Sequence, residues 1–369
     1  MNRRLILAVA LCLPAAAMLP EVVPGAEPGP ILEAPLGPDQ PASVLEKPAQ
    51  PSPSPSPANA EAAPTVATTP ADAGDEFPLQ GEYVGYTFTP LLGREYCGIQ
   101  VAALGDGEFR AVQFRGGLPG AGWNRRDKFP LTGQRDGHLL RLTAEGRHGT
   151  YTVLVREGSA ELRNAASQPV GRLRKIHRTS PTMGAAPPFD AVVLFDGSHA
   201  DEFESAKIVD GHLLLAGAIT KRMFRDFRLH VEFKTPFMPR ARGQGRGNSG
   251  VYIQKRYEVQ ILDSFTLSGA PNECGGLYRQ RPPDLNMAFP PLSWQTYDID
   301  FTAARFNDDG EKVENARLTV VHNGVAIHDD VELPNKTGAG DREGPTPGPI
   351  RFQWHSDPVH FRNLWIVEK

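Results

Sequence analysis

Short runs of alternating apolar and polar residues fill most of the chain after residue 77, whereas patterns of helical period are nearly absent. A strand turns successive side chains to opposite faces, so this two-residue period predicts β-strands. Turn dipeptides such as Asp106-Gly107 and Asn323-Gly324 stand between the runs, and they tolerate the positive φ angles that tight hairpins need. We therefore predict an all-β protein built largely from antiparallel hairpins.

The spacing of the runs divides the chain after residue 77 into two regions. Residues 77–178 alternate short apolar runs with turn signals, which predicts a small all-β domain. Residues 179–189 begin with TSPTMGAAPP and are typical of a linker. Residues 190–369 contain about eleven short strand patterns, which favours an antiparallel sandwich or jelly roll over a doubly wound fold.

The N-terminal segment differs from the rest in composition. Residues 1–17 combine Arg3 and Arg4 with an apolar run and a small-residue site at Ala15–Ala17, so we predict a signal peptide and an exported protein, periplasmic or secreted. The apolar run is well short of the roughly 20 residues that span a bilayer, and we expect no membrane insertion. Residues 18–76 hold 14 of the 35 prolines, which predicts a disordered Pro-rich linker.

The net charge limits which macromolecules the chain can bind, and the cysteine content limits which disulfides it can form. The net charge of -4 and the pI of about 6.2 leave no basic field for nucleic acid, so we expect no nucleic-acid partner. After removal of the signal peptide, Cys97 and Cys274 remain, one in each predicted β domain. An exported protein could oxidise them, but the sequence leaves open whether they pair.

Polar residues at every second position interrupt two of the most apolar runs. In NSGVYIQ, Asn248 and Tyr252 share a face opposite the aliphatic residues, and in YEVQILD, Glu258 and Gln260 do the same, with Asp263 following the strand. A carboxylate and an amide on one face suit recognition or acid–base chemistry on a polyhydroxylated ligand. An ordinary solvated sheet face gives the same pattern.

The order of longer motifs adds a resemblance. The segments VLFDGS, FRDFRLHVEFK, GNSGVYIQ, YEVQILDS, GGLY, WQTYDIDF and QWHSDPVHFRNLWI, between about Asp190 and Glu368, closely resemble the domain of unknown function 1080, also described as the 3-keto-disaccharide hydrolase domain. The resemblance implies a concanavalin-like jelly roll. It also implies cleavage of 3-keto-glycosides by elimination followed by hydration, with net hydrolysis. Where the family commonly has QDHG, this chain has Gln353-Trp354-His355-Ser356, which puts a role for that acid in doubt.

The chemistry implied by the resemblance requires few groups. A ketone at C3 acidifies the hydrogen on C2, so a base near C2, an acid near the leaving oxygen and donors for the developing enolate suffice. We expect His355 to be the base, because its ordinary pKa near 6.5 allows both protonation states near neutrality. Glu258 and Asp263 are candidates for the acid or a second base. The candidate substrate-binding residues are Gln260, Asn248, Lys221, Arg222, Tyr252, Tyr278 and Gln353.

The same chemistry sets expectations for cofactors and partners. The substrate would be a 3-keto sugar, already oxidised by a separate glycoside 3-oxidoreductase, so we predict no redox cofactor in this protein. The sequence has no HExxH, CxxC or P-loop motif. We predict no metal site, although scattered Asp, Glu and His residues leave a divalent metal open.

Two other functions are compatible with the sequence. Glu258, Gln260 and Asp263 have a spacing similar to the catalytic strand of retaining laminarinase-type glucanases, which need two carboxyl groups about 5–5.5 Å apart. A noncatalytic carbohydrate-binding module would instead stack sugars on aromatic side chains, for which Tyr252, Tyr278, Trp294 and Trp354 are available.

Overall fold

The computed structural model describes residues 66–89, 93–146 and 149–369, all within one compact unit that spans residues 59–369. The predicted signal peptide and most of the predicted Pro-rich linker lie outside the described residues. Helix is confined there to three-residue 3₁₀ turns at Pro70–Asp72, Phe77–Leu79 and Gly243–Gly245. The predicted all-β class is confirmed. No helix within the described ranges is long enough to cross a bilayer.

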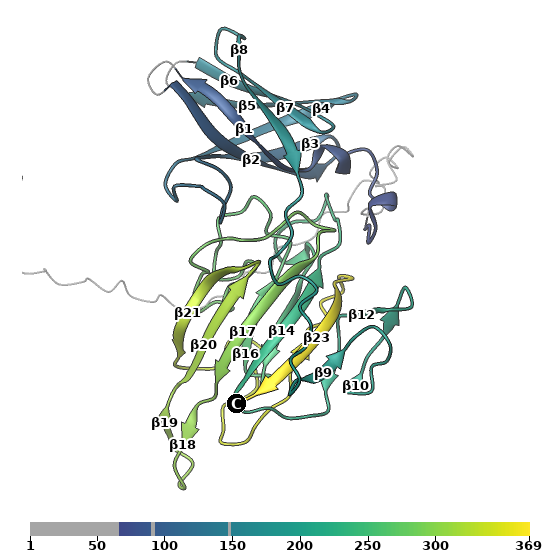
Figure 1. Ribbon diagram of the computed structural model, residues 1–369, viewed down its shortest axis with the longest axis vertical. Coiled ribbons are helices and arrows are strands. Elements are labelled where there is room, and N and C mark those ends of the chain that lie inside the picture. The colour runs from purple at the N-terminus through teal and green to yellow at the C-terminus, as the bar shows by residue number, and fades with distance from the viewer. Residues whose placement is uncertain (1–65, 90–92, 147–148) are drawn as a thin grey trace, which may run out of the picture. The chain divides into compact units, whose positions relative to one another are not determined.

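The first eight strands close into an antiparallel barrel (Figure 1). They are β1 (Gly81–Thr89), β2 (Gly93–Gly105), β3 (Glu108–Arg115), β4 (Lys128–Asp136), β5 (Leu139–Gly146), β6 (Gly149–Arg156), β7 (Ser159–Arg163) and β8 (Pro169–Ile176). The barrel closes where β1 pairs with β8. Gly85 lies at this seam, and a Cβ there would clash with the carbonyl of Arg172, so the close approach needs a glycine.

Apolar side chains occupy the interior of the barrel. Tyr83, Val101, Phe109, Leu142 and Val153 are at most 1% exposed and belong to one cluster. Full burial of a large apolar side chain contributes roughly 1.5–3 kcal/mol. The barrel core is therefore a packed, stabilising core.

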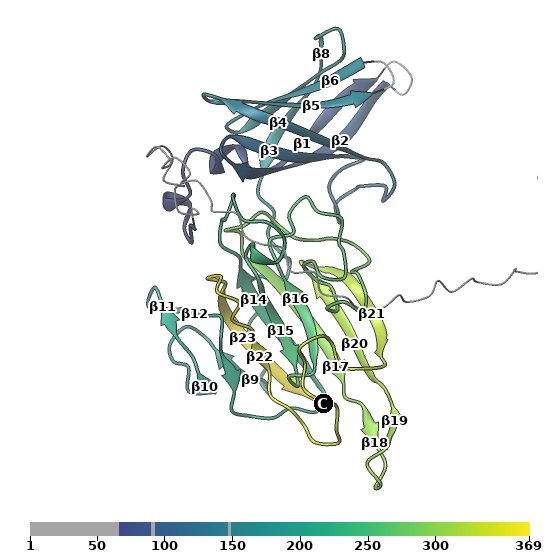
Figure 2. The ribbon, with the colours of Figure 1, turned by 180° about the vertical axis from the view of Figure 1, so that it is seen from behind.

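The remaining strands form a two-sheet sandwich, which agrees with the predicted jelly-roll class (Figures 1 and 2). The five-stranded sheet has the order β10 (Phe203–Ser205), β13 (Ile219–Thr220), β22 (Arg351–Phe352), β15 (Ser249–Ile253), β16 (Tyr257–Ile261). The eight-stranded sheet has the order β11 (Ile208–Val209), β12 (Leu213–Leu215), β23 (His360–Glu368), β14 (Phe227–Lys234), β17 (Gln295–Thr302), β20 (Ala316–His322), β21 (Val325–Leu333), with β9 (Val192–Phe195) beside β23. A small separate sheet pairs β18 (Arg305–Phe306) with β19 (Lys312–Glu314).

The core of the sandwich explains the alternation seen in the sequence. Val251, Ile253, Val259 and Ile261 are fully buried in the main apolar cluster together with residues of the eight-stranded sheet, such as Phe233. Because strand side chains alternate, the intervening residues of β15 and β16 point to the outer face of the five-stranded sheet. That face carries the polar residues singled out in the sequence.

Residues 66–76 correct one boundary. We expected them to belong to the disordered linker, but Ala67 pairs with Phe237 through two backbone hydrogen bonds of 3.0 and 2.9 Å. Ala67 and Ala73 are also buried in the apolar cluster of the barrel. The linker prediction extended too far because the proline and alanine content of this stretch resembles the segment before it.

Residues 179–189 cross the outer face of the eight-stranded sheet. The hydroxyl of Thr182 donates to Asp298 Oδ2 at 2.6 Å, and the backbone N–H of Gly184 donates to Glu232 Oε1 at 2.6 Å. This segment is therefore held to the sandwich by specific polar contacts.

Candidate functional site

A polar cluster lies on the outer face of the five-stranded sheet, whose strands β15, β16 and β22 are labelled in Figure 2. Tyr252 of β15 pairs with Glu258 of β16 on one side and with Arg351 of β22 on the other, and Gly250 pairs with Gln260. Residues directly opposite each other in antiparallel strands share a face. The register therefore brings a carboxylate, a phenol, a guanidinium and an amide together.

Gly250 makes room for the carboxyl group at the centre of this cluster. A Cβ at Gly250 would lie 2.5 Å from Glu258 Oε1 and 3.1 Å from its Cγ, closer than van der Waals contact allows. The Glu258 side chain thus lies over a position that has no side chain of its own. Any larger residue at 250 would displace the carboxyl group.

The electrostatics of Glu258 are those of a proton-transfer group. It is 2% exposed, and this burial raises its pKa from 4.5 to about 7, although a hydrogen bond from Tyr252 and the charge of Arg351 act in the opposite direction. Near neutral pH both protonation states are therefore populated. A general acid or base works best when its pKa lies near the working pH.

Amide groups surround the carboxyl group. The hydrogen-bond network favours turning the Gln260 amide nitrogen toward Glu258, where it donates to Oε1 at 3.1 Å. Asn248 Nδ2 donates to the carbonyl of Gln244 at 2.7 Å, and Tyr278 Oη donates to Gln244 Oε1 at 3.4 Å. Gln244 belongs to the 3₁₀ turn before β15. It connects Asn248 and Tyr278, two of the predicted binding residues, and was not anticipated from the sequence.

A hollow of about 330 Å³ lies beside the cluster and is lined by Gly217, Arg351, Phe352, Gln353 and Trp354. Arg351 Nε and Gln353 Oε1 are buried and have no hydrogen-bond partner among the described residues. Buried polar atoms are normally paired, so these two are available to a bound polar molecule. Trp354, which is 50% exposed, gives the hollow an aromatic rim.

His355 lies at the edge of the site. It is exposed on the loop after β22, and no hydrogen bond or ion pair within the described ranges joins it to Glu258. The charge of His355 lowers the pKa of Asp357. Asp357 Oδ2 also accepts a hydrogen bond of 2.7 Å from the backbone N–H of Asn248. Burial raises the pKa of Asp357 in spite of these partners. Asp357, like Arg351 and Gln244, was missed by the sequence reasoning.

Three predicted site residues make contacts elsewhere. Asp263 Oδ2 accepts from Arg246 Nε at 2.7 Å, and Arg246 also donates to the carbonyl of Ala103 in the barrel. Lys221 donates to the carbonyl of Asp201, and the exposed Arg222 pairs with Glu368 at 2.7 Å. Asp263 follows the end of β16, where the alternation that places Glu258 and Gln260 no longer holds. These three residues serve structural contacts and do not join the cluster.

The two cysteines and the possible metal ligands lie outside this cluster. Cys97 and Cys274 are both buried and free, and burial raises the pKa of each, so they do not form a bridge. Among the described residues, no group of three His, Cys, Asp or Glu side chains could hold a metal ion.

Comparison with known proteins links the sandwich to a family. Residues 190–367 match the family model described as a 3-keto-alpha-glucoside-1,2-lyase-like domain. A crystal structure from Parabacteroides distasonis ATCC 8503 at 2.13 Å resolution, described as a "putative glycosyl hydrolase", is 32% identical, with 49% of this chain and 84% of that chain covered and a TM-score of 0.45. A second crystal structure with the same description, at 2.00 Å, is 22% identical, with coverages of 48% and 99% and a TM-score of 0.35. A search of curated proteins found no match.

Proposed function

Because this chain belongs to the 3-keto-alpha-glucoside-1,2-lyase-like family, we propose that it is a carbohydrate-active enzyme that cleaves 3-keto-glucosides by elimination and hydration. The observation that carries the proposal is Glu258. This buried carboxyl group has a pKa of about 7, and it belongs to the polar cluster whose Arg351 lines the hollow.

The first step removes a proton from C2 of the sugar. The C3 ketone takes up the electron pair as an enolate, which then expels the glycosidic oxygen from C1 and leaves a C1=C2 double bond. The leaving oxygen takes a proton. Water then adds at C1 and a proton returns to C2, so the sum of the steps is hydrolysis.

Glu258 is the proton-transfer group in this scheme. With a pKa of about 7, a useful fraction is ionised at neutral pH and can accept the C2 proton, and the protonated form can return it during hydration. Arg351 lies beside it, with its guanidinium carbon 3.9 Å from the centre of the Tyr252 ring. A fixed cation next to the base can stabilise the developing enolate.

His355 takes a secondary role. Its exposed position on the loop after β22, beside Asp357, suits protonation of the leaving oxygen at the solvent side of the site. Gln260, Asn248 and Gln353 would contact the sugar hydroxyl groups. Trp354 would lie against the leaving group.

The placement of Asp263 argues against direct hydrolysis by a retaining mechanism. That mechanism needs two carboxyl groups facing one glycosidic bond. The predicted second carboxyl group is paired with Arg246 and is 5% exposed. The predicted pair of Glu258 and Asp263 facing one bond is therefore not formed, which favours elimination with Glu258 as the proton-transfer group.

The proposed reaction also implies a preceding reaction and a cellular compartment. The substrate must be oxidised at C3 before it reaches this protein, so the enzyme would act after a separate glycoside 3-oxidoreductase. We propose that this happens in the periplasm or outside the cell, on the basis of the N-terminal segment.

The test is cleavage of 3-keto-trehalose and 3-keto-glucosides by the purified protein in deuterated water. We expect deuterium at C2 of the released 3-keto sugar and no cleavage of the unoxidised glycosides. Samples without enzyme correct for spontaneous exchange. Cleavage with the C2 hydrogen retained, or equal turnover of unoxidised glycosides, would contradict the elimination mechanism.

A further inference from the structure

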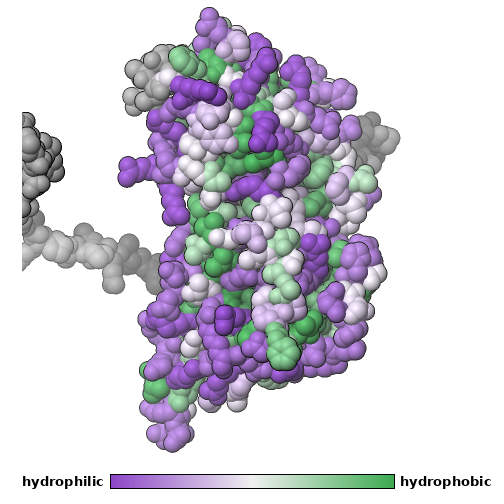
Figure 3. Space-filling view, viewed as in Figure 1, coloured by the Kyte–Doolittle hydropathy of each residue, from purple (hydrophilic) through white to green (hydrophobic). Residues whose placement is uncertain are grey.

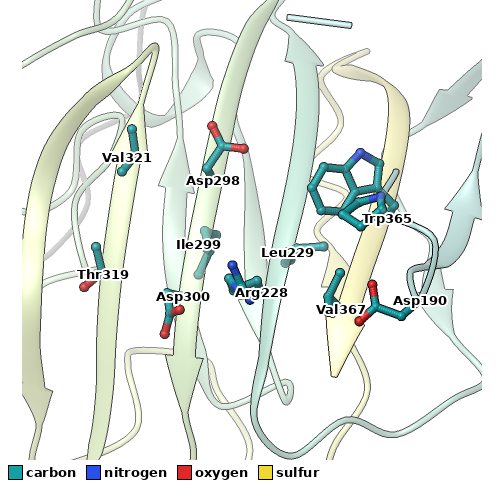
Figure 4. A pocket seen from close by; sticks show the side chains of 11 residues that line it. Asp190, Arg228, Leu229, Asp298, Ile299, Asp300, Thr319, Val321, Trp365 and Val367 are labelled. Carbon is teal, nitrogen blue, oxygen red and sulfur yellow. The ribbon is translucent and has the colours of Figure 1, made fainter. Parts of the chain in front are cut away.

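The outer face of the eight-stranded sheet carries a second hollow, of about 450 Å³. The two sheets of a sandwich present their outer faces in opposite directions, so this hollow lies across the domain from Glu258. Figure 3 shows this side of the molecule, where apolar and polar surface are interspersed. The side chains drawn in Figure 4 come from β14, β17, β20 and β23, from Pro188 in the segment that crosses the sheet, and from Asp190 next to it.

Strand register arranges seven of the lining residues, together with the buried His230, in two rows across the sheet. The first row runs Thr319, Asp300, Arg228, Val367, and the second runs Val321, Asp298, His230, Trp365. Neighbouring strands lie about 4.8 Å apart, so each row of four spans about 14 Å. The hollow is therefore elongated and shallow, a shape that suits an extended ligand.

Trp365 is held rigidly in the second row. Its indole stacks on His230 with a centroid distance of 5.0 Å and an interplanar angle of 17°, and its Nε1 donates to the carbonyl of Ala185 at 3.2 Å. His230 Nδ1 is in turn 2.6 Å from Asp298 Oδ1. An aromatic ring fixed before binding loses little entropy when a ligand stacks on it.

The guanidinium group of Arg228 is available to a ligand at this hollow. It is exposed, and within the described ranges it has no hydrogen bond or ion pair. Asp300 faces it directly across the strands but accepts from Lys369 Nζ instead. In Figure 4, Arg228 lies between Asp300 and Leu229, toward the centre of the lining residues.

The charges of the hollow select against charged ligands. The three carboxylates of Asp190, Asp298 and Asp300 are largely offset by Arg228 and Lys369, so about one net negative charge remains and neither an anion nor a cation gains a strong net field. What is available is a rigid aromatic ring, valine side chains, carboxylate acceptors and a free five-donor guanidinium. This combination matches the apolar faces and hydroxyl edges of pyranose rings.

We propose that this hollow is a noncatalytic binding site for a neutral oligosaccharide, with Trp365 stacking on one sugar unit and Arg228 donating to the hydroxyl groups of the next. The site lies away from the candidate active site, and the proposal does not depend on the reaction proposed there. It would keep the enzyme on a glycan while the other face acts.

The test is titration of the full-length mature protein with maltohexaose, cellohexaose and laminarihexaose, followed by calorimetry and tryptophan fluorescence, up to about 10 mM so that roughly millimolar affinities are detected. We expect at least one of the three to bind. Arg228→Ala should weaken that binding at least about fivefold, which is about 1 kcal/mol. Trp365→Phe, which keeps a ring against His230, should weaken it less.

The controls separate this site from the active site. Arg174→Ala removes an exposed arginine of the barrel and should leave binding unchanged. Glu258→Gln should leave binding unchanged too, and Arg228→Ala should keep turnover of a 3-keto-glucoside. The proposal is overturned if none of the three sugars binds or if Glu258→Gln abolishes binding while Arg228→Ala does not. A dimer in sedimentation experiments that Arg228→Ala dissociates would assign this face to a second copy of the chain and overturn it as well.

Discussion

Two glutamates on the two outer faces of the sandwich have nearly the same burial and opposite acidity. Glu258 on the five-stranded sheet is 2% exposed and has a pKa of about 7, whereas Glu232 on the eight-stranded sheet is 1% exposed and has a pKa of about 2. Burial raises the pKa of both. Glu232, however, also accepts hydrogen bonds from Asn363, Arg362 and the backbone N–H of Gly184, and it lies 3.6 Å from His230 Nε2; these partners lower its pKa.

The difference shows that partners, more than burial, separate a structural carboxylate from a reactive one. Glu232 has a cation and several donors fixed on both oxygens, so its charge is stabilised permanently. Glu258 has a phenol, an amide and a nearby arginine whose guanidinium stacks on a tyrosine ring. Its charge is therefore only partly compensated. A group left in this state can exchange its proton with a substrate at neutral pH.

The strongest test of the comparison is activity. Glu258→Gln keeps the shape of the side chain but cannot take up a proton, so kcat for a 3-keto-glucoside should fall by about 10²–10⁴-fold. Asp263→Asn is the matched control, and the folded enzyme should keep its kcat because Asp263 is paired with Arg246. Steady-state kinetics of the two variants at pH 7 decide the matter. A Glu258→Gln enzyme within a few-fold of the wild type would remove Glu258 from the reaction.

Glu232, in contrast to Glu258, should stabilise the fold. Its pKa is lower in the folded protein than the ordinary 4.5, so its ionisation stabilises the fold above pH 4.5, and that stabilisation is lost as the pH falls toward 2. Glu232→Gln should therefore cost about 3 kcal/mol of unfolding free energy at pH 7. Urea unfolding at pH 7 and at pH 3 measures this cost. We expect a smaller difference at pH 3, and an equal difference at both values would show that the ion pair is not its source.

Glu258→Gln should have the reverse effect on stability. The folded pKa of Glu258 is raised, so the folded protein holds a proton that the unfolded chain releases between pH 4.5 and 7, and stability falls as the pH rises through this window. The variant escapes this penalty. It should be more stable than the wild type by about 3 kcal/mol at pH 8 and equal to it near pH 4.5. Thermal unfolding across this range checks the sign, and a variant less stable at pH 8 would contradict the raised pKa.

The fold was predictable because it depends on local patterns. The two-residue alternation and turns such as Asp106-Gly107, where both residues adopt positive φ angles of 56° and 79°, are short-range signals that survive in a single sequence. The boundary near residue 76 could not be predicted, because Ala67 is ordered by pairing with Phe237, about 170 residues away along the chain. Composition carries no information about such a long-range partner.

The candidate site was predictable in part for the same reason. Alternation placed Glu258, Gln260 and Tyr252 on one face, and the strand register brings them together. It could not show that Asp263 turns to Arg246, since that depends on the path of the chain after the strand. Arg351 shows the same alternation in PIRFQW and could have been found, but Gln244 comes from a loop whose position only the three-dimensional fold determines.

The smallest effect concerns the tuning of Glu258 by its phenol neighbour. The Tyr252 hydroxyl donates to the Glu258 carboxylate and lowers its pKa, so Tyr252→Phe should raise that pKa further. If Glu258 acts as the base, the rising limb of kcat/KM against pH should move to higher pH, with a loss of a few-fold at pH 6 that disappears by about pH 9. Tyr278→Phe is the control, because its hydroxyl contacts Gln244 rather than Glu258. A limb that stays in place in Tyr252→Phe would mean that this pH dependence comes from another group, and His355 would be the first to examine.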